Sequence, residues 1–175
     1  MASLQTVAMG LVIVFLDVGP SGWDWIADPV GWLLVLIGLA GLRGILPSYR
    51  ALSITAWVCL GISLLTYSPH SVRTLDPMLG WLFSLPTVAF SFLCCDALMD
   101  VTTDPLHKRF DVLRWCFVVV GALPLLLYGA GMDWLTVPTA VVAVAVNIVL
   151  LFTLWSAGDQ DPPGVEEPAK ESQDS

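Results

Sequence analysis

Six apolar segments without charged residues dominate the chain, and short polar segments separate them. They cover approximately residues 2–16, 29–42, 51–69, 77–95, 115–132 and 134–158. A helix of about 20 apolar residues crosses a hydrocarbon core of about 30 Å, and within lipid only a helix or a closed barrel satisfies every backbone N–H and C=O group. The pattern therefore predicts an all-α fold, a polytopic transmembrane helix bundle of about six spans that can be divided into three helical hairpins.

The first apolar segment is short for a membrane span. As a helix, residues 1–16 would extend only about 24 Å. Local thinning of the bilayer would accommodate such a span, and the alternative is a re-entrant segment that leaves five true spans. A cleaved signal peptide is disfavoured, because the segment has no basic start and no cleavage site of small residues follows it.

Basic residues fall almost entirely on one side of the predicted bundle. If the chain starts in the cytoplasm, only Arg73 lies outside. The residues on the inner side are Arg43, Arg50, Lys108, Arg109, Arg114 and Lys170. Because short cytoplasmic loops of membrane proteins carry an excess of Lys and Arg, we expect both termini to be cytoplasmic.

Composition excludes several classes of protein. Hydrophobic residues make up 57% of the chain and charged residues 13%, so a transmembrane domain at residues 1–156 leaves no room for a soluble catalytic domain. Residues 157–175 are rich in Pro, Glu, Asp and Ser, which predicts a disordered, acidic cytoplasmic tail. With 7 basic residues in the whole chain, no stripe of positive charge is available to neutralise phosphates, and nucleic acid is not expected as a partner.

One turn is repeated at the outer side. Asp-Pro-Val-Gly at residues 28–31 and Asp-Pro-Met-Leu-Gly at residues 76–80 each open a predicted helix. Asp favours a helix N-cap, Pro favours the first helical position, and a carboxylate complements the positive end of the helix dipole. Gly31 and Gly80 would let a neighbouring helix approach closely. The repeat indicates a shared hairpin design.

The first copy of this turn lies in a longer motif, D-x-x-x-D-x-x-G. Its residues are Asp24, Asp28 and Gly31, with Asp17 upstream and Pro29 inside it. Around this motif the chain resembles an uncharacterised family of small multi-pass bacterial membrane proteins. The resemblance covers the first two spans well, the segment before the fifth span only loosely, and the tail not at all. It implies an integral protein of the bacterial cytoplasmic membrane and supplies no catalytic residues.

The acids at the end of the fourth apolar segment are candidates for chemistry. Asp96, Asp100 and Asp104 follow a helical spacing, and His107 comes next. Acids at a helix carboxyl end oppose the helix dipole and call for a compensating cation. One hypothesis is a cation or proton site at the cytoplasmic mouth, formed by Asp96 and Asp100 with His107. The alternative pairs Asp96 with a basic residue of a facing inner segment: Arg43, Arg50, Lys108, Arg109 or Arg114.

A second group of acids lies on the outer side. A short loop could bring Asp17, Asp24 and Asp28 together with Asp76, and their oxygens could hold Ca²⁺ or attract a cationic substrate. Helix capping and solvation explain the same residues without a ligand. We favour capping.

Other residues are expected to pack the helices. Ala40 and Gly44 form a pair of small residues four positions apart, which is typical of close helix contacts, and Asn147 is placed to hydrogen-bond to a second helix. The cysteines are interpreted as small buried hydrophobes, since no C-x-x-C spacing occurs. They are Cys59, Cys94, Cys95 and Cys116.

No signature of a catalytic centre, metal site or cofactor site occurs in the sequence. We therefore expect no enzymatic activity, metal or cofactor. The favoured hypothesis is a membrane scaffold or accessory subunit, embedded in the lipid bilayer, that contacts a second copy of itself or another membrane protein. The alternative is a small transporter or channel subunit for a cation or small solute.

Overall fold

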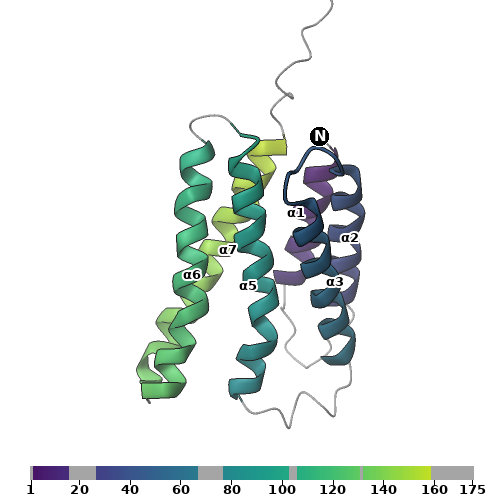
Figure 1. The fold of residues 1–175 in the computed structure, drawn as a ribbon. Helices are drawn as coiled ribbons and strands as arrows, with labels where there is room; N and C mark the ends of the chain where they lie inside the picture. Colours follow the sequence, from purple (N-terminus) through teal and green to yellow (C-terminus); the bar gives the residue numbers. More distant parts are fainter. Residues whose placement is uncertain (1, 16–26, 67–76, 103–105, 131, 159–175) are drawn as a thin grey trace, which may run out of the picture.

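The computed structural model describes residues 2–15, 27–66, 77–102, 106–130 and 132–158. Most of these residues form α-helices, and the described ranges contain no strand (Figure 1). The helices are α1 (Ala2–Phe15), α2 (Ala27–Gly41), α3 (Tyr49–Thr66), α5 (Pro77–Met99), α6 (Leu106–Ala130) and α7 (Thr136–Gly158), with a short 3₁₀ turn, η2 (Asp133–Leu135), before α7. The predicted all-α class is confirmed.

Helix length divides the bundle into two groups. Helices α3, α5, α6 and α7 have 18 to 25 residues and are long and apolar enough to cross a membrane. Helices α1 and α2 have 14 and 15 residues, which corresponds to about 21 to 23 Å. The protein is thus an integral membrane protein by its helices, and the shortness predicted for the first segment applies to the second as well.

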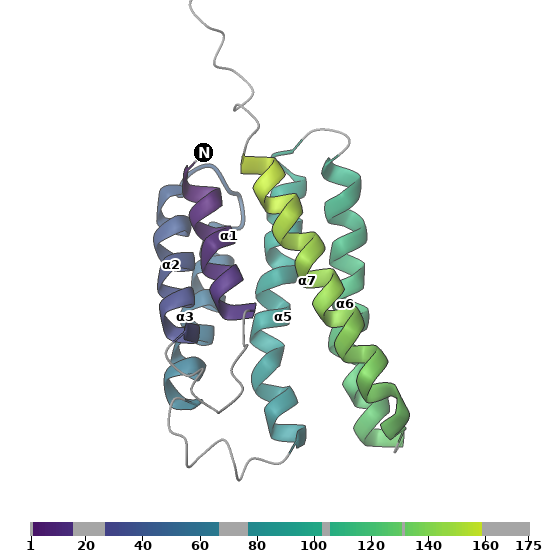
Figure 2. The same cartoon turned by 180° about the vertical axis from the view of Figure 1, so that it is seen from behind.

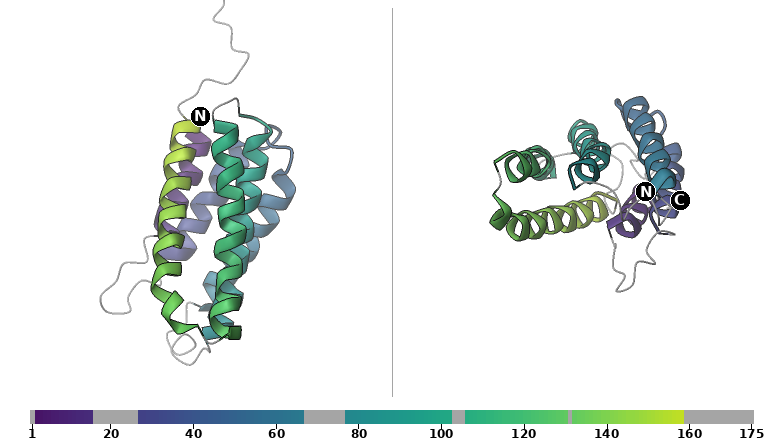
Figure 3. Two further views of the ribbon diagram at one scale, coloured as in Figure 1. Left: turned by 90° about the vertical axis from the view of Figure 1, so that its left-hand side faces the viewer. Right: turned by 90° about the horizontal axis from the view of Figure 1, so that it is seen from below.

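The six helices form a closed ring. Each helix packs against the next one in the chain, and α1 packs against α7 to close the ring (Figures 1 and 3). Successive helices run in opposite directions, so α1 begins and α7 ends at the same end of the bundle. The turn at residues 42–48 and the turn after α5 lie at this end too. We call it the basic end, because it carries Arg43, Arg50, Lys108 and Arg109.

The interior of the ring is filled by apolar side chains. Phe90 and Phe110 are fully buried, and the ring of Trp32 meets the ring of Phe90 edge-on, with 5.2 Å between their centroids. The outer faces are apolar as well, with Leu65 75% exposed and Phe152 72% exposed. A soluble monomer rarely exposes apolar surface on this scale, whereas a bilayer favours it.

Helices α1 and α2 make the closest helix contact, and glycines make it possible. A Cβ atom added to Gly31 would come within 2.7 Å of the Gly10 carbonyl oxygen, and one added to Gly38 would come within 2.7 Å of the Ser3 carbonyl oxygen. The backbones of the two helices therefore touch directly. The sequence predicted such an approach for Gly31 and for Gly80; it is confirmed for Gly31, whereas no atom of the chain lies within 4 Å of a Cβ added to Gly80.

The predicted small-residue pair does not form this contact. Helix α2 ends at Gly41, and Gly44 lies in the turn beyond it with a φ of 92° and no atom within 4 Å of the position a Cβ would take. Glycine is favoured there because other residues avoid positive φ. Ala40 is exposed. Helix α2 instead presents Gly31 and Gly38 to α1. The predicted close contact at Ala40 and Gly44 is therefore wrong within this chain.

Two predicted boundaries also move. Helix α6 begins at Leu106, not near residue 115, so the basic residues that the sequence placed in a loop extend the helix beyond its apolar part. Helix α7 continues through Gly158, slightly past the predicted end of the transmembrane domain at residue 156. The predicted disordered tail from residue 159 onward lies outside the described residues.

Candidate functional site

Arg114 is the centre of a charged cluster on the apolar wall between α5 and α6. Its Nη1 donates a hydrogen bond to Oδ1 of Asp96 on α5 at 2.9 Å, and its Nη2 donates to Oδ1 of Asp111 on α6 at 2.9 Å. Asp96 lies near the end of α5 and Arg114 lies two turns into α6, so the antiparallel packing of the two helices brings them level. One guanidinium thus links two carboxylates on neighbouring helices.

Aromatic rings surround the same guanidinium. Its carbon lies 5.9 Å from the centroid of Phe92 and 5.7 Å from that of Trp115, distances at which a ring face attracts a cation. The Arg114 side chain is 23% exposed, whereas Asp96 and Asp111 are 40% and 45% exposed. The positive charge is therefore the most enclosed member of the cluster, which carries one net negative charge.

His107 caps the end of α5. Its Nδ1 lies 3.0 Å from the carbonyl oxygen of Met99, the last residue of that helix. The last four carbonyls of a helix have no partner within it, so the geometry assigns the ring proton to Nδ1. The Leu98 carbonyl accepts the backbone N–H groups of Val101 and Thr102, and the Thr102 hydroxyl also donates to it at 2.7 Å. The histidine that the sequence assigned to a cation site therefore stabilises a helix end.

The three residues of the predicted cation or proton site have different surroundings. Asp96 is bound to Arg114, one of the five pairings that the sequence left open, while Asp100 is exposed in the turn after α5. Asp104 lies outside the described residues. Across the described ranges, no group of three or more His, Cys, Asp or Glu side chains is arranged to hold a metal ion. The arrangement fits a link between α5 and α6 better than a cation site.

The outer-loop motif is described only at its carboxyl end. Asp17, Asp24 and Asp76 lie outside the described residues, so the proposed group of outer acids stays a prediction. Asp28 lies in the first turn of α2, where its charge complements the helix dipole, and Pro29 follows it. Both residues lie in the first turn, but the helix begins at Ala27, two residues before the start that the sequence predicted.

Asn147 bonds within its own helix, whereas Trp81 bonds to a neighbouring helix. The Asn147 side chain donates to the Ala143 carbonyl of its own helix at 2.9 Å, and its Oδ1 has no hydrogen-bond partner in the described structure, which corrects the predicted interhelical bond. Trp81 donates its indole N–H to the Gly121 carbonyl of α6 at 3.1 Å and so links α5 to α6.

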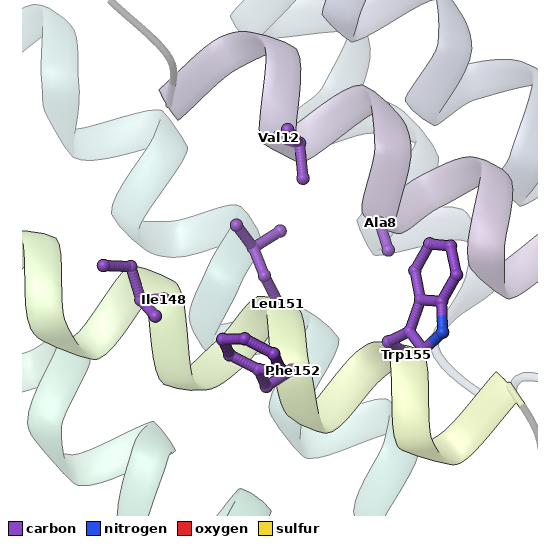
Figure 4. Close-up of a pocket in the computed structure, with 6 residues that line it drawn as sticks. All are labelled: Ala8, Val12, Ile148, Leu151, Phe152 and Trp155. Carbon is purple, nitrogen blue, oxygen red and sulfur yellow. The ribbon is translucent and has the colours of Figure 1, made fainter.

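A shallow groove lies between α1 and α7 (Figure 4). Its volume is about 280 Å³, and Ala8 and Val12 face Leu151, Phe152 and Trp155 across it. The indole nitrogen of Trp155 is the only polar atom among the side chains that Figure 4 draws. The groove offers no group that could take part in chemistry and matches the acyl chains of a bilayer.

Comparison with known proteins gives no match to a family model, a curated protein or a solved structure. The resemblance to small bacterial membrane proteins therefore stays a prediction.

Proposed function

We propose that this integral membrane protein is a non-enzymatic scaffold or accessory subunit. The observation that carries the proposal is the interior of the ring, which offers no polar pathway within the described part of the chain. The buried polar side chains there are Ser63, Ser91 and Thr153, and each donates its hydroxyl to a carbonyl of its own helix. A path for ions or polar solutes needs polar groups that face a common channel.

The charged cluster supports the same proposal. A carboxylate that carries a permeating cation has to exchange its partner, but Asp96 is bound to a guanidinium that Phe92 and Trp115 also hold in place. The cluster acts as a fixed link between α5 and α6. It gives the bundle a defined shape for a partner to recognise.

The outer face offers a place for a second helix. Gly80 on α5 is exposed, with no atom within 4 Å of the position a Cβ would take, and Gly61 on α3 also has this space free. In lipid, helices associate where small residues let their backbones come close. We propose that this face contacts a second copy of the chain or another membrane protein.

Flux measurements separate the scaffold from the transporter alternative. We expect purified protein in liposomes to conduct neither protons nor Na⁺ above the level of protein-free liposomes, and Asp96→Asn to leave this result unchanged. Cation flux that Asp96→Asn abolishes would overturn the scaffold proposal and assign transport to Asp96.

Crosslinking tests the contact face. In a variant without native cysteines, Gly80→Cys should form a disulfide-linked dimer in membranes, whereas the neighbouring Leu79→Cys, also exposed, should crosslink far less. Equal crosslinking at both positions, or crosslinking at neither, would show that Gly80 does not mark a specific self-contact, and a partner-protein contact would then have to be tested by co-purification.

We further propose that the protein lies in the bacterial cytoplasmic membrane with its basic end in the cytoplasm. The described basic residues gather at the end where α1 begins and α7 ends, which supports this orientation. An impermeant thiol reagent applied to intact cells should label Ser71→Cys and leave Ser48→Cys unlabelled. The reverse pattern would invert the orientation.

A further inference from the structure

A second groove, on the other side of α7, differs from the apolar one. Figure 2 shows α7 crossing from α6 near its beginning to α1 near its end, so α6 and α7 separate toward the basic end. Between them lies a groove of about 500 Å³. Its walls include Val112 and Cys116 of α6 and Ala145 and Val149 of α7.

Two cations stand at the basic end of this groove. Lys108 and Arg109 lie in the first turn of α6, one turn before Val112, and both are exposed. Within the described ranges, the ion pairs of the protein both belong to Arg114, and neither includes Lys108 or Arg109. Asp111, which follows on the same helix, already accepts a hydrogen bond from Arg114.

We propose that this groove binds an anionic phospholipid from the surrounding bilayer. Its phosphate would lie at Lys108 and Arg109, and one acyl chain would lie along the apolar walls toward Cys116. Arg pairs with phosphate through two parallel N–H donors, and basic pockets between transmembrane helices bind anionic headgroups. This inference goes beyond the scaffold proposal and does not depend on it.

The size of the groove favours a lipid over a protein helix. A helix with its side chains is about 10–12 Å wide and rises about 5.4 Å per turn, so about 500 Å³ holds little more than one turn. A flexible acyl chain can follow the same space over its whole length. The groove between α1 and α7 has no cation at its lining and supplies an internal comparison.

Selectivity should come from the headgroup. An acyl chain that leaves the bilayer for an apolar groove gains little, since lipid and protein walls are equally apolar. A basic residue at an anionic membrane surface contributes about five-fold in affinity. We therefore expect the two cations together to favour an anionic lipid over a zwitterionic one by about 25-fold.

Native mass spectrometry can test the proposal, because it resolves bound lipid and oligomeric state together. The protein, purified in detergent, would be titrated with phosphatidylglycerol and with phosphatidylcholine of the same acyl chains. We expect one phosphatidylglycerol to be retained about 25-fold more tightly than phosphatidylcholine. The preference should disappear in the double variant Lys108→Gln/Arg109→Gln.

Matched variants distinguish a built site from general surface charge. The double variant Arg43→Gln/Arg50→Gln removes the same charge from the same end, away from the groove, and should retain the preference. Ala145→Trp fills the groove without a change of charge and should lose the bound lipid. Equal loss in both charge variants, or full retention in Ala145→Trp, would overturn the proposal. A dimer that Ala145→Trp converts to a monomer would also overturn it, with a second copy as the occupant.

Discussion

The two tightest helix pairs of this protein are held together by different physical means. Helices α1 and α2 touch through their backbones, because Gly10, Gly31 and Gly38 remove the side chains between them. Helices α5 and α6 come close at a single glycine, Gly121 beside Val88, and polar groups link them in addition. These are the ion pair of Arg114 with Asp96 and the indole hydrogen bond of Trp81. Neither pair can rely on the hydrophobic effect, since lipid is as apolar as a helix face.

Backbone contact and polar links suit helices of different length. Backbone contact needs no desolvated charge, but it tolerates no added atom, so it fits the two short helices that touch over most of their length. Polar links tolerate space between helices and fix them at single points: Trp81 near the start of α5 and Asp96 near its end. They fit the long helices, where Pro86 and Pro124 interrupt the regular hydrogen bonding.

The largest effect should come from filling the glycine contact. Gly31→Leu would drive its side chain into Val14 and the Gly10 carbonyl, and we expect a loss of about 3 kcal/mol in the free energy of unfolding, at the upper end of overpacking penalties. The matched control is Gly80→Leu in the second copy of the turn, where no atom of the same chain lies within 4 Å and where detergent removes the proposed contact with another chain. Unfolding in SDS, followed by circular dichroism, should leave that control within about 0.5 kcal/mol of wild type.

Equal losses in the free energy of unfolding for Gly31→Leu and Gly80→Leu would contradict the expected difference between the two copies of the turn. They would mean that both copies of the turn pack a helix closely within the chain, or that the contact of Gly80 with another chain persists in detergent.

The next largest effect should follow removal of the guanidinium. Arg114→Met leaves Asp96 and Asp111 side by side without a cation, and since both are 40% or more exposed, we expect a loss of about 1–2 kcal/mol instead of the larger cost of a fully buried pair. Arg50→Met, at the exposed start of α3, is the control and should change stability little. SDS unfolding again provides the measurement.

A double-mutant cycle sharpens this result. If Arg114 acts through Asp96, then adding Asp96→Asn to Arg114→Met should cost less than Asp96→Asn costs alone, with a coupling of about 1 kcal/mol. Strictly additive losses would show that the two side chains act separately, and α5 and α6 would then depend on packing alone.

A smaller loss is expected from Trp81→Phe, which keeps the aromatic ring and removes the N–H that reaches Gly121. Interhelical hydrogen bonds in membrane proteins average about 0.6 kcal/mol, and we expect a loss of that size. Trp57→Phe changes a tryptophan that is 59% exposed on α3 and should have no measurable effect. A midpoint shift for Trp57→Phe as large as that for Trp81→Phe would argue against a specific role for the bond.

The sequence predicted the helices more accurately than their contacts, for a physical reason. Charge-free segments identify helices in lipid directly, and all six predicted segments correspond to described helices. Which face of a helix points inward depends on its rotation, and a uniformly apolar helix carries little record of that rotation. The packing prediction was therefore right for Gly31 and wrong for Ala40 and Gly44, and the start of α6 was missed because charged residues were interpreted as a loop.

Replacement of Asn147 should have the smallest effect on the free energy of unfolding, and it should raise this free energy where the other substitutions lower it. Its amide N–H bonds only within α7, and its Oδ1 has no partner among the described residues, so the side chain contributes little to the contact between helices. Replacing a polar group that lacks a partner by an apolar one of similar size is neutral or stabilising, and Asn147→Leu should raise the free energy of unfolding by up to about 0.5 kcal/mol. If Asn147→Leu instead lowers stability in membranes but not in dilute detergent, where chains separate, then Oδ1 bonds to a second chain. Polar pairing would in that case join protein chains as well as α5 and α6, and α7 would become part of the scaffold's contact surface.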